Sequence, residues 1–165
     1  MTDKTALLRR IHFLLILFIV ALAAAGLTAI PLRWELALLN QWLGTKSFLS
    51  QLLPSMAGWI SRVNDSVQGG YGQYPLLAYG TDWLAFAHVV IAVAFIGPLR
   101  DPVRNIWVIE FGMIACALIL PWALIFGAVR HIPLFWTLID MSFGAFGIIP
   151  LWLVRSDILR ISEEV

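Results

Sequence analysis

Residues 132–154 read IPLFWTLIDMSFGAFGIIPLWLV, and this stretch decides how the rest of the chain is interpreted. It contains 23 residues and a single charge, the carboxylate of Asp140. An apolar run of about 20 residues is long enough for a helix to cross the ~30 Å hydrocarbon layer of a bilayer. A carboxylate inside such a helix costs about 2.5–3.5 kcal/mol to insert, so it normally faces other protein groups and has a partner. The stretch therefore predicts a membrane helix built around Asp140.

The composition of the 165-residue chain indicates a membrane protein. Hydrophobic residues make up 61% and charged residues 13%, whereas a soluble domain is closer to half apolar and a quarter charged. The net charge is +1 and the longest basic run is Arg9-Arg10, so we expect no nucleic-acid partner. The single cysteine, Cys116, excludes an intrachain disulfide and a CxxC-type metal site, and we expect no metal.

Three further apolar runs extend this prediction to an all-α integral membrane protein, a four-transmembrane-helix bundle in one domain (1–165). The run after the basic start is also similar to a signal peptide, but it is long for one, so we interpret it as the first membrane helix. The predicted spans are 11–30, 82–98, 106–129 and 132–154, followed by a polar tail at 155–165.

The connection at 31–80 carries two amphipathic patterns. Leu36, Leu39 and Leu43 share one helical face, and apolar residues recur at helical spacing between positions 48 and 63. Two amphipathic helices on the membrane surface are the natural interpretation. A turn is expected near 64–72, where Gly69, Gly70 and Gly72 occur.

The distribution of basic residues predicts the orientation. Four crossings place both termini on one side, and that side would hold seven of the eleven basic residues. The positive-inside rule then places the termini in the cytoplasm and the 31–80 connection outside, with a bacterial inner membrane as the expected location. The seven residues are Lys4, Arg9, Arg10, Arg100, Arg104, Arg155 and Arg160.

Two ionisable residues in the second and fourth predicted spans form the candidate site. His88 is six residues after Asp82 and Asp140 is seven after Pro133, which places them about 9 and 10 Å into their helices. If these helices face each other, the two side chains share a hydrogen bond in an outer-leaflet pocket that binds a small or lipidic ligand. In an enzymatic version, Asp140 orients His88, which acts as general base or proton relay. The proposed ligand-binding neighbours are Tyr79, Trp83, Trp136, Thr137 and Ser142.

A second polar group is expected near the opposite face, where His12, Arg104 and Glu110 could interact. Polar residues in membrane helices also join helices without any chemistry, so a structural subunit remains an alternative. Membrane lipid, a homo-oligomer or a larger membrane complex are the expected partners. Motifs such as GxSxG, HExxH and Walker loops do not occur in the sequence.

A family resemblance adds another alternative. Residues 9–13, RRIHF, with Gly26-Leu27-Thr28 after them, resemble the opening helix of prokaryotic di-haem b-type membrane cytochromes, and His88 followed by Arg100 resembles their second helix. Those proteins hold b haem between paired histidines of a four-helix bundle. The resemblance implies an electron-transfer subunit of a respiratory complex. The fourth span carries Asp140 in place of histidines, so a single haem b would be held by His88 and His131.

Overall fold

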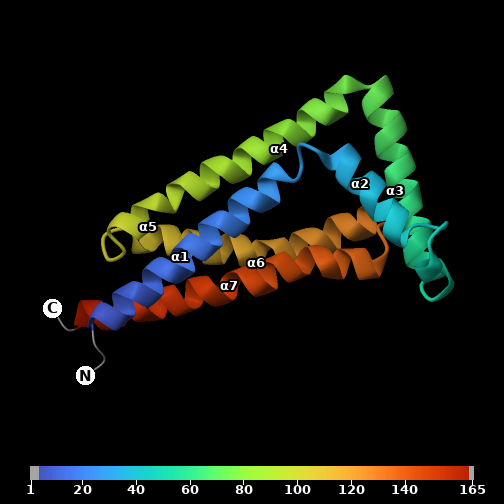
Figure 1. Cartoon of the computed structure of the whole chain (residues 1–165). Helices are drawn as coiled ribbons and strands as arrows, with labels where there is room; N and C mark the ends of the chain where they lie inside the picture. The colour runs from blue at the N-terminus through green and yellow to red at the C-terminus, as the bar shows by residue number, and fades with distance from the viewer. Residues whose placement is uncertain (1–3, 164–165) are drawn as a thin grey trace. The chain divides into compact units, whose positions relative to one another are not determined.

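The computed structural model describes residues 4–163, and all regular elements in this range are helices (Figure 1). Four helical segments are long and apolar enough to cross a membrane. They are α1 (Lys4–Leu27), α4 (Pro75–Ala94) continued by the short α5 (Ile96–Arg100), α6 (Ile106–Val129) and α7 (Leu134–Glu163). Two shorter helices, α2 (Leu32–Leu43) and α3 (Pro54–Gln73), lie between the first two spans, with a 3₁₀ turn, η1 (Phe48–Gln51). The predicted four-span, all-α fold is confirmed.

The surfaces of the four spans are apolar. Only 17–22% of the residues in the most apolar window of each span are buried within the protein. Large side chains such as Phe13, Trp122 and Phe146 are more than 60% exposed. Apolar patches of this extent on helices of this length are compatible with lipid as the solvent, and they explain why 61% of the chain is hydrophobic. The chain is a small four-span membrane protein.

The chain forms two compact units, and the first comprises Met1–Ala21 and Ile91–Val165. Within it, α6 and α7 lie side by side (Figure 1). Its core combines residues from α1, from the α4–α5 segment, from α6 and from α7. The fully buried members are Ile11, Leu15, Phe95, Ile109, Leu151, Val154 and Ile158.

The second unit, Leu22–Val90, contains α2 and α3, which lie side by side (Figure 1). Leu36 of α2 and Ile60 of α3 are buried, so the apolar faces predicted from the sequence include buried positions. Ser61 joins the two helices because its hydroxyl donates to Asn40 Oδ1 at 2.7 Å and accepts from the Thr45 N–H at 3.0 Å. The pair is a hairpin closed by apolar contacts and by this hydrogen-bond chain.

Several helices extend beyond the bounds that the sequence predicts, and α1 already begins at Lys4 instead of residue 11. The second span begins at Pro75, seven residues before the expected start, because proline is well suited to the first turn of a helix. Helix α7 continues through the predicted tail to Glu163. Its apolar face continues there, since Ile158 and Ile161 are buried in the core while Arg160 is exposed.

The predicted glycine turn is wrong. Gly69, Gly70 and Gly72 lie inside α3, which continues to Gln73. Each glycine costs a helix about 1 kcal/mol relative to alanine. Packing of α3 outweighs this cost, as it does for helices generally.

Candidate functional site

Asp140 lines an apolar groove on the α6–α7 pair. It lies six residues after the start of α7, about 9 Å along the helix axis. The groove is open, has a volume of about 590 Å³ and is formed chiefly by α6, from Ala115 to Gly127. Arg130, directly after the end of α6, is its other charged residue. The groove is therefore apolar except for one carboxyl group and one guanidinium group.

Glycines bring the backbones of α6 and α7 together beside this groove. A Cβ atom at Gly144 would overlap the carbonyl oxygen of Cys116, so only glycine allows this contact. Nearer the turn between the helices, a Cβ at Gly127 would lie 2.7 Å from Thr137 Oγ1. Thr137 is 4% exposed because it fills this contact. Small residues at these positions thus determine how closely the groove-forming helices approach.

The carboxylate of Asp140 has no hydrogen bond or ion pair within residues 4–163. Its neighbours on α7 are already satisfied locally: the Ser142 hydroxyl donates to the Ile139 carbonyl at 2.6 Å. Arg130 lines the same groove without an ion pair to Asp140 in this part of the chain. Ionisable groups inside membrane-spanning helices normally have a partner, so the missing partner sets Asp140 apart.

His88 belongs to the other unit and has its own surroundings. Its Nδ1–H donates to the Leu84 carbonyl at 2.8 Å. Gly26 of α1 packs against the His88 side chain, and a Cβ there would overlap that of His88. His88 is thirteen residues from the start of α4, and Asp140 is six residues from the start of α7. Their pairing stays a prediction.

The predicted ligand-binding neighbours do not line the groove. Tyr79 and Trp83 are exposed on α4, where their rings meet edge to face at 5.9 Å. Trp136 packs edge to face with Phe135 at 6.5 Å. The groove residues that were not predicted recur every four positions in the sequence, and this spacing was the available signal: Leu118, Trp122 and Phe126 on α6, and Arg130 directly after it.

The three residues of the second predicted polar group, His12, Arg104 and Glu110, each have a hydrogen-bond partner outside that group. Glu110 accepts a hydrogen bond from Arg155 Nε at 2.9 Å, and both side chains are about 40% exposed. The backbone N–H of Arg104 donates to Asp101 Oδ1 at 3.1 Å. The His12 Nδ1–H donates to the Leu8 carbonyl at 2.7 Å.

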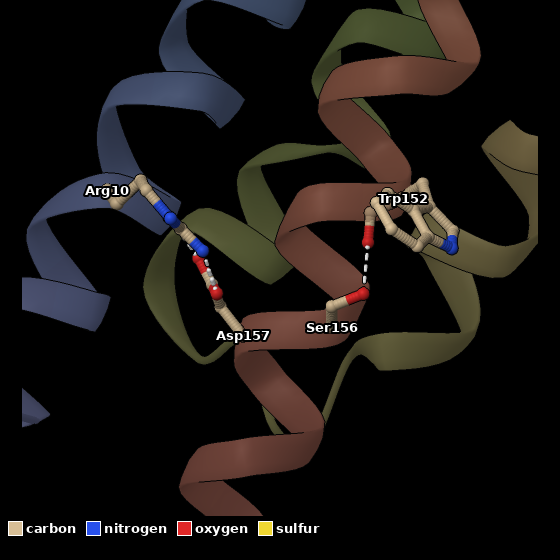
Figure 2. Close-up of polar contacts among 4 residues, drawn as sticks. All are labelled: Arg10, Trp152, Ser156 and Asp157. Carbon is tan, nitrogen blue, oxygen red and sulfur yellow. Dashed lines mark hydrogen bonds and ion pairs between the residues drawn. The ribbon is translucent and has the colours of Figure 1, made fainter. Parts of the chain in front are cut away.

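An ion pair that the sequence analysis missed joins α1 to α7. Figure 2 shows Arg10 directed at Asp157: its Nε donates to Oδ2 at 2.6 Å and its Nη2 donates to Oδ1. The Asp157 side chain is fully buried and that of Arg10 is 49% exposed. The neighbouring Ser156 hydroxyl donates to the Trp152 carbonyl at 2.9 Å, as the figure also shows. This two-point contact fixes α1 against the core rather than forming a ligand site.

The two histidines predicted to hold a haem b, His88 and His131, belong to different units, and their pairing stays a prediction. His88 is the only histidine of its unit. His12 lies near the Arg10–Asp157 pair, whereas His131 is exposed in the turn between α6 and α7, with φ 55°. Asp157 is 23 residues beyond the start of α7, about 35 Å along the axis from that turn.

Comparison of the chain with protein-family models, with characterised proteins and with solved structures finds no match. What the protein does must therefore follow from its own geometry. Asp140, in its apolar groove, is the ionisable residue on which a proposal can be based.

Proposed function

We propose that this four-span membrane protein binds a lipidic ligand in the groove beside Asp140. One observation carries the proposal: an open apolar groove of about 590 Å³ contains a carboxylate that has no partner in the described chain. Ligand pockets of 300–1,000 Å³ with mostly apolar walls and a few polar groups are typical of small-molecule sites. In the membrane, the molecules that reach such a groove are lipids and lipid-soluble compounds.

The direction of the groove supports the same proposal. The lining residues of α6 extend from Ala115 to Gly127, about 18 Å along the helix, and Arg130 lies directly after its end. A hydrocarbon chain can follow this path against Leu118, Ile119 and Phe126. Asp140 and Arg130 then provide two polar contacts for the head of the ligand. We propose binding alone, and the action of His88 with Asp140 as general base or proton relay stays a prediction.

In this proposal both termini lie in the cytoplasm of a bacterial cell, and Arg130 lies at the outer face of the inner membrane. The support is the excess of basic residues on the terminal side. Two of the seven, Arg10 and Arg155, are in ion pairs. Five others have no ion pair among residues 4–163 and are available to lipid head groups: Lys4, Arg9, Arg100, Arg104 and Arg160.

Filling the groove with a larger side chain tests the proposal. Ala115 and Ala117 are both exposed alanines of α6, but only Ala115 lines the groove. Lipid retained by the purified protein is measured by native mass spectrometry after detergent exchange. We expect Ala115→Phe to retain less lipid than the wild type and Ala117→Phe to retain the same amount. Equal retention by both variants, with unchanged thermal unfolding, would overturn the proposal.

A further inference from the structure

We propose that the head group taken by the groove is an amine, so that the ligand is an amphiphile whose protonated nitrogen pairs with Asp140. This inference rests on the proposed function, because it names the class of molecule that the same groove accepts. It follows from three features of the described chain: the carboxyl group of Asp140, the aromatic rings that line the same groove and the position of Arg130.

The charge of Asp140 selects among head groups. A carboxyl group in an apolar groove keeps its charge only where an opposite charge or several hydrogen bonds compensate it, and otherwise takes up a proton. Within residues 4–163 neither compensation is present. A primary ammonium supplies both, since it neutralises the charge and donates hydrogen bonds. A hydroxyl donates one hydrogen bond and leaves the charge, and a carboxylate or phosphate at the same place is repelled.

The aromatic lining favours a cation as well. Trp122 and Phe126 both line the groove, and their ring centroids are 4.6 Å apart. The faces of tryptophan and phenylalanine attract ammonium groups, most strongly where water is excluded. A site that combines a carboxylate with aromatic rings is the usual protein surrounding for an amine.

Arg130 restricts where the amine can lie. It is one of the two charged residues of the groove and is exposed, whereas Asp140 is partly buried. Arg130 repels an ammonium placed beside it and attracts an anion. The amine therefore belongs at Asp140. Any anionic group of the ligand belongs at the Arg130 end.

Three amphiphiles with the same twelve-carbon chain test the inference: dodecylamine, dodecanol and dodecanoate. Each is titrated into the intact protein in maltoside micelles at pH 7, and the shift in thermal unfolding gives an apparent affinity. A hydrogen bond to a charged group contributes roughly 1.5–3 kcal/mol. We therefore expect the wild type to bind the amine at least about tenfold more tightly than the alcohol. Dodecanoate should bind most weakly.

Matched variants assign the preference to Asp140. Asp140→Asn should bind amine and alcohol equally, whereas Asp82→Asn, which changes an exposed acid of α4 outside the groove, should keep the preference. If Asp140→Asn does not fold, Asp140→Ser replaces it. The order of the three apparent affinities for the wild type decides whether the groove prefers an amine, even without a variant.

The outcomes separate the two proposals. Equal binding of all three amphiphiles, abolished by Ala115→Phe, would overturn the amine inference and leave lipid binding in the groove intact. Absence of dodecylamine binding to the wild type would overturn the amine inference, and the lipid-retention experiment would then decide the proposed function. A preference for the amine that survives in Asp140→Asn would also overturn the inference.

Discussion

Removing Arg10 tests whether the contact between α1 and α7 depends on a buried charge. Arg10→Met keeps an unbranched side chain but leaves the Asp157 carboxylate, which is fully buried, without its two donors. Breaking a buried pair by removing one partner costs about 3–5 kcal/mol. Since the Arg10 side chain is 49% exposed, water can partly replace it. We therefore expect the free energy of unfolding to fall by the lower end of this range, about 3 kcal/mol.

The free energy of unfolding is measured by titration with sodium dodecyl sulfate in mixed micelles. Arg9→Met is the matched control, because Arg9 is exposed and makes no hydrogen bond or ion pair within residues 4–163. It should change the stability by less than about 0.5 kcal/mol.

The double variant with Asp157→Leu removes the stranded charge. It should therefore be more stable than Arg10→Met alone. Equal effects of Arg9→Met and Arg10→Met, or a double variant less stable than the single one, would refute the reasoning.

Three further substitutions test the packing and the exposed ion pair. Gly26→Leu should lower the free energy of unfolding by about 3 kcal/mol, because its Cβ would overlap that of His88. Gly58→Ala, at a site with no atom within 4 Å of the added Cβ, should raise it by about 0.5–1 kcal/mol in the same titration, and a loss at Gly58 would contradict this account. Glu110→Gln should cost less than about 1 kcal/mol, because its pair with Arg155 is substantially exposed, and a cost equal to that of Arg10→Met would show that burial is not the deciding factor.

The fold could be predicted from the sequence because long apolar runs have few solutions in lipid. Every backbone group of a span must be satisfied within the membrane, so the runs must be helices. The positions of helix ends were harder to predict. Pro75 begins its helix earlier than the apolar run suggests, and the last turns of α7 are held by packing of Ile158 and Ile161.

The candidate site was predicted only in part. Asp140 was identified because a lone charge in an apolar run stands out in any sequence. Its groove was not, since Trp122 and Phe126 are indistinguishable by type from the many exposed aromatic residues of the spans. The partners of Arg10 and Glu110 depend on which helix faces which, and a single sequence contains no signal for that.

The glycine contacts between α6 and α7 have a consequence for the order in which the chain assembles in the membrane. These two helices are joined by a short turn, and they approach closely at Gly144, which meets the Cys116 carbonyl, and at Gly127, which meets the Thr137 side chain. Asp157 behaves differently, because its carboxylate can leave water only once Arg10 has arrived with α1. The carboxyl-terminal hairpin can thus form soon after insertion, and the arrival of the amino-terminal helix completes the structure.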